Sequence, residues 1–270
     1  MKKENLIFDI GMHTGRDTEF YLKKGFNVIA VEANPQLVEK GKLKFKSEIE
    51  KGQLIIIDQA ISDTIGTIDF FVFEGKDDWG TIYPEWNRSM DLNVKTIKVE
   101  TITLENLLEK NGTPYYMKID IEGADILCLK SLLKTYERPT YISIELLTPN
   151  NLAKKVDSLD ILCHLKVLGY NKFLVSDQSM NKFIKIPKPS LEGRYADYCF
   201  DGSSSGLFGK ELKGPWFSLD KIASEYLNYF YQRKNIKNKK LNFLMEKTKR
   251  IFYKKRFHSN GWFDVHAKIE

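Results

Sequence analysis

The chain opens with two short apolar runs, and each of them ends in an acidic residue. The first contains Asp9 and passes into a loop with glycine at positions 11 and 15, and the second ends at Glu32. A segment with helical periodicity separates them, so the pattern predicts a strand, a glycine loop, a helix and a second strand. Ligands of open α/β sheets bind outside the carboxyl ends of the strands. We therefore expect a nucleoside cofactor at this edge, with its ribose at Glu32.

The rest of the chain alternates between apolar runs of strand length and longer amphipathic segments, which predicts an α/β fold with a mostly parallel sheet. Residues 66–73 and 94–100 alternate with period two, which is typical of exposed antiparallel strands, and residues 79–86 between them are expected to form an inserted loop. The other expected strands are 26–32, 54–61, 117–121 and 141–146, with further strands at 173–176 and 262–268, and the expected helices are 35–51, 125–133 and 152–168.

The glycine spacing of the first loop indicates which nucleoside binds. A dinucleotide site needs G-x-G-x-x-G, whose middle glycine lets the backbone approach a pyrophosphate. Here Met12 and His13 occupy the tight part of the loop, and the spacing is G-x-x-x-G. S-adenosylmethionine contains no phosphate and needs no such cradle, so it is the cofactor that we expect. The alternative is an ordinary connection in which the glycines only allow a turn.

A second motif narrows this expectation. The segment 115–125 contains Lys118, Asp120, Glu122 and Gly123 and resembles the K-x-D-x-E-G signature of the FkbM family of methyltransferases. Residues 101–108 precede the signature as in that family, and residues 54–63 resemble its third strand, which ends beside the adenine. The resemblance covers roughly residues 5 to 146. A later segment, 202–209 with Gly-Pro-Trp at 214–216, looks like the tail of one FkbM subgroup, and we attach no role to it.

The resemblance implies a Rossmann-like class I methyltransferase fold. A mostly parallel central sheet would carry helices on both faces, with an inserted antiparallel hairpin and a C-terminal helical extension. We expect a methyltransferase domain over residues 1–215 and a basic helical extension over 216–270. The residues expected to hold S-adenosylmethionine are Asp9, Gly11, Gly15, Glu32, Asn34, Asp58, Ala60 and Asp120.

Four residues are candidates for catalysis. Methylation of an alcohol requires a group that accepts its proton, and carboxylates and imidazoles serve this purpose. In this fold the end of the fourth strand borders the methyl group, so Asp120 and Glu122 are candidates, and Glu145 and His13 join them. Asp120 could instead only hold the cofactor, Glu122 could form a salt bridge or helix cap, and His13 could be a hydrogen-bonding loop residue. The three acids also suit a divalent cation, although we predict no metal ligand.

The turn after the fourth strand bears on the acceptor atom. Enzymes that methylate exocyclic base amines resemble one another in an Asp/Asn-Pro-Pro-aromatic turn, whereas this turn contains no proline and an added acid. FkbM relatives act mainly on hydroxyls of sugars, glycans and natural products. The resemblance therefore implies O-methylation of a saccharide, a nucleotide- or phosphate-linked sugar or a similar metabolite. Trp79, Tyr83 and Trp86 would stack on a sugar face or fill the core.

Charge is concentrated near the end of the chain. Of the 270 residues, those from Arg233 to Arg256 include eleven Lys or Arg and one acid, and their apolar positions have helical spacing. We expect a basic amphipathic helix that packs on the core with its lysines in solvent. The alternatives are contact with an anionic acceptor, a peripheral anionic membrane surface or nucleic acid. The rival functions are an RNA-directed methyltransferase, which the basic segment suggests, and a non-catalytic nucleotide-binding protein with a degenerate site, which the intact acids argue against.

Cysteine usage and hydropathy indicate the compartment. The three cysteines show no C-x-x-C spacing, which favours a reducing environment. The first apolar run is interrupted by Asp9, and no apolar run reaches eighteen residues, so we expect neither an export signal nor a transmembrane helix. The expected location is cytoplasmic, and the oligomeric state is left open.

Overall fold

A seven-stranded sheet forms the centre of the protein in this computed structural model, which describes residues 2–84, 93–146, 158–234 and 262–270. Its neighbouring strands pair in parallel except around β11, which is antiparallel to both β9 and β10. The predicted mostly parallel α/β sheet is confirmed. In spatial order the strands are β10 (Lys172–Asp177), β11 (Phe263–Lys268), β9 (Tyr141–Leu146), β8 (Thr113–Ile119), β1 (Lys2–Ile10), β2 (Asn27–Glu32) and β3 (Leu54–Asp58).

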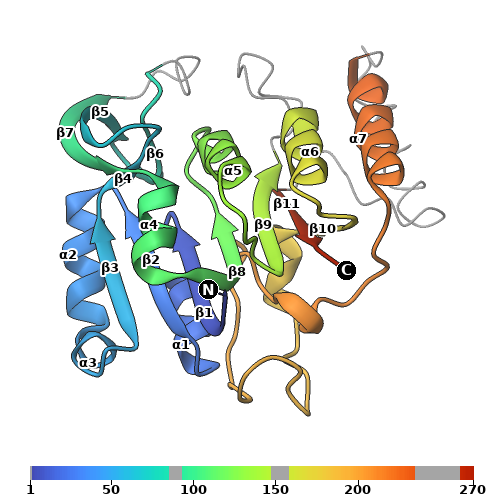
Figure 1. The fold of residues 1–270 in the computed structure, drawn as a ribbon, viewed down its shortest axis with the longest axis horizontal. Coiled ribbons are helices and arrows are strands. Elements are labelled where there is room, and N and C mark those ends of the chain that lie inside the picture. Colours follow the sequence, from blue (N-terminus) through green and yellow to red (C-terminus); the bar gives the residue numbers. More distant parts are fainter. Residues whose placement is uncertain (1, 85–92, 147–157, 235–261) are drawn as a thin grey trace.

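A second, four-stranded sheet lies over the carboxyl ends of β2 and β3 (Figure 1). The strand predicted at 54–61 is divided between the two sheets, because the chain leaves β3 at Asp58 and pairs with β7 from Ala60 onward. The loop predicted at 79–86 begins inside β6, whose pairing with β5 extends to Thr81. The strands of this sheet, in order, are β4 (Ala60–Ile61), β7 (Val94–Ile102), β5 (Gly66–Phe73) and β6 (Lys76–Thr81).

The helix predicted at 35–51 is interrupted at Phe45, whose buried ring accompanies a non-helical backbone angle. Asn34 caps its first part by accepting the backbone N–H of Gln36. The sequence pattern did not predict the helix at 104–111, whereas the helix at 219–234 falls within the helical extension predicted over 216–270. The predicted start of the helix at 152–168 lies outside the described residues. The helices are α1 (Arg16–Lys23), α2 (Pro35–Lys44), α3 (Lys46–Glu50), α4 (Leu104–Asn111), α5 (Asp125–Leu133), α6 (Ser158–Val167) and α7 (Leu219–Lys234), with 3-10 turns η2 (Gln178–Phe183) and η3 (Gly209–Glu211).

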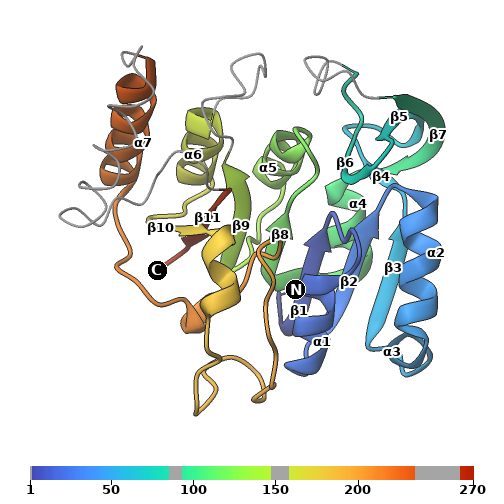
Figure 2. The same cartoon turned by 180° about the vertical axis from the view of Figure 1, so that it is seen from behind.

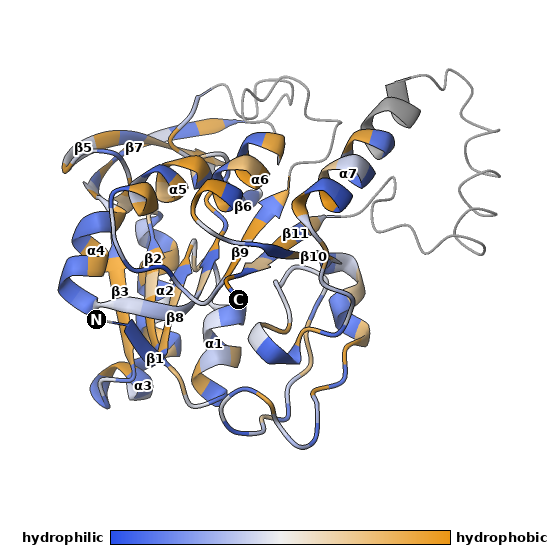
Figure 3. Ribbon diagram, turned by 45° about the vertical axis from the view of Figure 1, so that its right-hand side comes forward, coloured by the Kyte–Doolittle hydropathy of each residue, from blue (hydrophilic) through white to orange (hydrophobic). Residues whose placement is uncertain are grey.

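Side chains of the central strands alternate between two apolar layers. Phe8 and Ile10 face α4 to α7, which lie along the near side of the sheet in Figure 1. Ile7 faces α1 and the segment 184–216 on the other side, seen in Figure 2. Apolar residues therefore concentrate along the strands and the inner helix faces (Figure 3). Asp9 has the parity of Ile7, so its carboxylate is directed toward α1.

The C-terminal part of the chain is joined to this core. Lys24 and Glu211, both fully buried, pair at 2.7 Å and attach the segment 184–216 to the end of α1. β11 completes the central sheet, and the domain boundary at residue 215 stays a prediction. The basic segment from Arg233 to Arg256 begins in the last two residues of α7, and from residue 235 onward it lies outside the described residues. Within the described part of the chain, no helix has the length and apolar character needed to cross a membrane.

Candidate functional site

The two sequence motifs meet at Gly11. Its φ of +90° lies in the region that favours glycine, and a Cβ there would come within 1.9 Å of the backbone oxygen of Asp120. The backbone N–H groups of Gly11 and Met12 both donate to the carbonyl of Val31. The loop after β1 is thus in close contact with the turn after β8 and with the end of β2. No other residue type fits at position 11 without moving one of these strands.

Glu32 ends β2 and lines the same space. It is 8% exposed, and burial raises the pKa of its carboxyl. Its two oxygens accept the backbone N–H groups of His13 at 2.7 Å and Asn34 at 2.9 Å. Each carboxylate oxygen has a second lone pair, so Glu32 can still accept hydrogen bonds from a diol. The carboxylate is therefore oriented before any ligand binds.

Lys118 lies at the centre of a buried charge cluster. Its Nζ lies 3.5 Å from Asp9, 3.7 Å from Asp17 and 3.4 Å from Asp120, and it donates to the carbonyl of Gly11 at 3.1 Å. Burial alone would lower the pKa of this amine, but the three carboxylates raise it well above its usual range. Burial also raises the pKa of Asp17 to about 7. Lys118 therefore connects the first loop to the turn after β8 as a permanent cation.

Replacing Lys118 with Met should destabilise the protein strongly. The variant leaves three buried or half-buried carboxylates without their cation, and removing one partner of a buried ion pair costs about 3–5 kcal/mol. Urea denaturation measures this loss of unfolding free energy. The matched control is Lys98→Met, which removes an exposed pair with Asp69 and should cost about 0–1 kcal/mol. Equal losses in the two variants would show that Lys118 has no special structural role.

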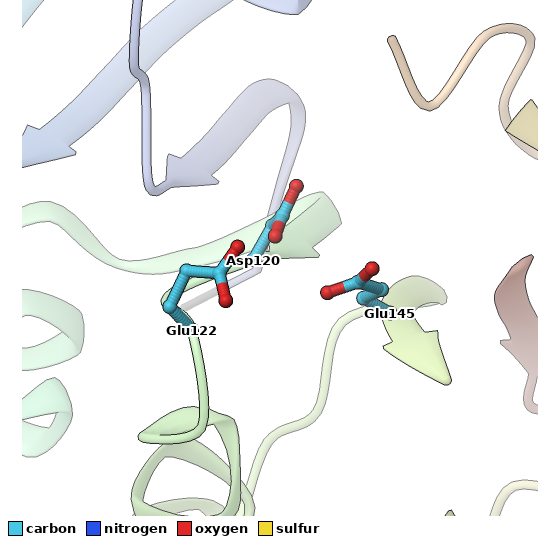
Figure 4. A group of neighbouring side chains, drawn as sticks. All are labelled: Asp120, Glu122 and Glu145. Carbon is cyan, nitrogen blue, oxygen red and sulfur yellow. The ribbon is translucent and has the colours of Figure 1, made fainter. Parts of the chain in front are cut away.

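Three carboxylates converge just beyond Lys118 (Figure 4). Asp120 and Glu122 follow β8, Glu145 lies near the end of β9, and one oxygen from each lies within 4.8 Å of the others. Glu122 has a φ of +50°, and its backbone carbonyl accepts a hydrogen bond from Thr81 of β6 at 2.8 Å. Burial, followed by the charges of Glu122 and Asp120, raises the pKa of Glu145 well above its usual range.

This arrangement permits two kinds of chemistry. A carboxyl whose pKa is raised retains a proton more readily than an ordinary Glu, which suits a general base near neutral pH. Three oxygen ligands at this spacing also suit a hard divalent cation. The geometry brings together three of the four predicted catalytic residues, and both chemistries remain compatible with it.

The fourth candidate, His13, lies in the loop after β1. Its φ is +52°, and its backbone N–H is bound by Glu32. Its ring nitrogen Nε2 lies 3.4 Å from Asp77 of β6. His13 therefore links the first loop to the small sheet.

The first loop, Glu32, Lys118 and the three converging carboxylates surround one cavity of about 210 Å³. The predicted site residues that line it are Gly11, His13, Glu32, Ala60, Asp120, Glu122 and Glu145. Four others do not. Asp9 is buried behind Lys118, Gly15 packs against Phe45 before α1, Asn34 caps α2, and Asp58 is exposed at the end of β3. Gln59 lines the cavity beside Ala60.

Aromatic and polar residues from other parts of the chain also line the cavity. Trp79 lines the cavity, Tyr83 does not, and Trp86 lies outside the described residues. Several lining residues were not predicted as site residues, because most of them belong to no recognisable motif, and Gln59 and Ser203 lie in segments whose individual side chains were given no role. They include Arg16, Asp17, Gln59, Asp77, Gln178, Ser203 and Trp262. Lys118 lies two residues before Asp120, and side chains at that spacing are expected on the same face of a strand. This spacing is the sequence signal that could have placed Lys118 beside Asp120.

Residues 9–172 match the methyltransferase FkbM domain model, which is more than half of the chain. No curated protein matches it. Among solved structures, methyltransferase FkbM from Methylobacillus flagellatus KT shows 12% identity and a TM-score of 0.43, over 66% of this chain and 41% of that one. This chain therefore spans less than half of that protein.

Two other solved structures are similarly distant. A SAM-dependent methyltransferase from Archaeoglobus fulgidus shows 13% identity and a TM-score of 0.38, over 99% of this chain and 87% of that one. Precorrin-6Y C5,15-methyltransferase from Geobacter metallireducens GS-15 shows 13% identity and a TM-score of 0.33, over 66% and 69%. The assignment rests on the domain match together with the two motifs that meet at Gly11. The chain belongs to the FkbM family of S-adenosylmethionine-dependent methyltransferases.

Proposed function

We propose that this protein is an O-methyltransferase that transfers a methyl group from S-adenosylmethionine to a hydroxyl of a saccharide, a nucleotide- or phosphate-linked sugar or a similar metabolite. The observation that carries the proposal is the convergence of Asp120, Glu122 and Glu145 in a cavity that also contains Glu32. A carboxylate beside the reacting centre is what deprotonation of an alcohol requires.

The residues present fit the cofactor. Glu32, already oriented by two backbone N–H groups, would accept the ribose hydroxyls, and Gln59 and Ala60 would lie beside the adenine. The backbone at Gly11 is exposed to the cavity without a side chain. The bound cofactor supplies a methyl group that its sulfonium makes electrophilic. The protein's own contribution is to align the acceptor and remove its proton.

Glu145 is the base that the geometry supports best. Its carboxyl faces Glu122 across the cluster, and the repulsion between them favours uptake of a proton. Glu145 accepts the hydroxyl proton as that oxygen forms its bond to the methyl carbon. Asp120, held by Lys118 at 3.4 Å, has a positioning role at the other side of the cluster.

Ligand binding tests this function directly. S-adenosylmethionine and S-adenosylhomocysteine should both bind, whereas NAD should not, because His13 occupies the position of the middle glycine at which a pyrophosphate would approach the backbone. Isothermal titration calorimetry with the three compounds measures the difference. Binding of NAD as tight as that of S-adenosylhomocysteine would contradict the proposal and favour a dinucleotide-binding protein.

A further inference from the structure

One end of the cavity is built by residues that lie beyond the family domain. The domain match ends at residue 172, yet Gln178, Ser203 and Trp262 also line the cavity. We call these three residues the C-terminal wall. Gln178 begins η2 directly after β10, Trp262 directly precedes β11, and the backbone N–H of Gln178 donates to the carbonyl of Trp262 at 2.8 Å.

The strand order places this wall opposite the proposed ribose site. β10 and β11 lie at one side of the sheet and β2 and β3 at the other, with β9, β8 and β1 between them (Figures 1 and 2). Glu32 ends β2, whereas Gln178 and Trp262 of the C-terminal wall adjoin β10 and β11, and β11 pairs with β9, which carries Glu145. A cofactor with its ribose at Glu32 and its methyl group near Asp120 leaves this end of the cavity for the acceptor.

The wall is held in place by polar contacts. The side-chain amide of Gln178 donates to Asp264 at 2.7 Å, and Asp264 lies opposite Glu145 in the β-ladder. Ser203 accepts a hydrogen bond from Arg16 and donates to Asp201 at 2.9 Å. These contacts orient two hydrogen-bonding side chains before an acceptor arrives.

The glycine- and serine-rich segment 202–206 supports this arrangement. The backbone N–H of Ser205 donates to both oxygens of Asp17 at 3.1 Å, and Asn181 of η2 donates to the carbonyl of Ser204 at 2.7 Å. Gly206 has a φ of +83°, and a Cβ there would come within 2.7 Å of the Asn181 amide. The segment therefore connects the first turn of α1 to η2 and places Ser203 at the cavity.

Charge narrows the chemistry of the acceptor. Among the described residues, the basic side chains that line the cavity besides His13 are Arg16, which pairs with Asp201, and Lys118, which is surrounded by carboxylates. Acidic lining residues outnumber these basic ones, and a cavity with an excess of one sign of charge repels ligands of the same sign. The acidic lining residues are Asp17, Glu32, Asp77, Asp78, Asp120, Glu122 and Glu145.

We propose that the C-terminal wall binds a sugar ring without a phosphate or carboxylate, with the ring against the Trp262 indole and its hydroxyls at Gln178 and Ser203. This proposal rests on the proposed function and narrows its substrate class to neutral and amino sugars. An apolar aromatic surface with a few oriented polar groups is typical of small-molecule sites. Trp262 is 57% exposed and lines the cavity.

Three pyranoses that differ in charge test the proposal. D-glucose, D-glucosamine and D-glucuronic acid are titrated into protein saturated with S-adenosylhomocysteine, and the same sugars are supplied with S-adenosylmethionine to measure methyl transfer. We expect glucose or glucosamine to bind at least about tenfold more tightly than glucuronic acid. Preference for glucuronic acid, or binding of none of the three, overturns the proposal. Failure of S-adenosylhomocysteine to bind overturns the proposed function instead.

Two variants test whether the preferred sugar binds at the C-terminal wall. Trp262→Ala should weaken binding of the preferred sugar about tenfold and leave the affinity for S-adenosylhomocysteine within about twofold. Met180→Ala is the control, because Met180 is exposed on η2, the 3-10 turn that begins with Gln178, and does not line the cavity. Unchanged sugar binding in Trp262→Ala, or an equal loss in Met180→Ala, contradicts the assignment.

Discussion

Replacement of Glu145 with Gln should lower turnover by roughly 10²- to 10⁴-fold while the affinity for S-adenosylmethionine is retained, because the amide keeps the shape of the side chain but cannot accept the hydroxyl proton. In the unmodified protein, kcat should rise as the pH passes upward through the pKa of Glu145, since only the ionised carboxylate accepts a proton. Burial and the neighbouring acids place that pKa well above the usual range of a Glu. The pH dependence of single-turnover rates measures this effect.

Matched variants separate the possible bases. Glu122→Gln removes the charge that faces Glu145, so it should shift the pH profile of kcat toward lower pH rather than abolish the rise. His13→Ala should matter less than either acid, because its ring faces Asp77. Near-full rates in both acid variants together with a large loss in His13→Ala would identify His13 as the base. Activity that disappears with a chelator and returns with Mg²⁺ would instead assign the acids to a metal.

Replacement of Glu32 with Ala should raise the dissociation constant of S-adenosylhomocysteine by at least about 10²-fold. The variant removes two charge-assisted hydrogen bonds to the ribose, each worth about 1.5–3 kcal/mol. Titration calorimetry measures the change. Glu39→Ala provides a control, because Glu39 is an exposed acid on α2 that pairs with Lys42. Unchanged affinity in Glu32→Ala would remove Glu32 from the binding site.

Glu32 also accepts hydrogen bonds from the backbone N–H groups of His13 and Asn34. Part of the loss of affinity in Glu32→Ala could therefore come from a change in the first loop. A cofactor analogue without the ribose 2′-hydroxyl distinguishes the two effects through a double-mutant cycle. Wild-type protein should bind the analogue more weakly than S-adenosylhomocysteine, whereas Glu32→Ala should bind the two with nearly equal affinity. A full analogue penalty in the variant would mean that Glu32 acts only on the loop.

The sequence by itself determined the α/β class, the family and the residues at the ends of three strands. Glu32, Asp120 and Glu145 each follow an apolar run that is recognisable locally, and parallel strands bring their carboxyl ends to one edge of the sheet. The G-x-x-x-G loop and the K-x-D-x-E-G signature were recognisable because each lies within about a dozen residues. The steric contact between Gly11 and the backbone of Asp120 brings the two motifs together in the fold.

Only the tertiary structure decided which predicted residues reach the cavity and what completes it. Asp58 ends its strand in register with Glu32 but is exposed, because the chain turns there into the second sheet. Ser205 meets Asp17 across 188 positions, and Gln178 meets Asp264 across 86. Such contacts depend on how distant segments pack on the sheet, and no local periodicity or spacing encodes them. The sequence therefore indicated part of the proposed cofactor end, since Gly11, Glu32 and Ala60 line the cavity whereas Asp9, Gly15, Asn34 and Asp58 do not. The residues of the proposed acceptor end were brought together by packing.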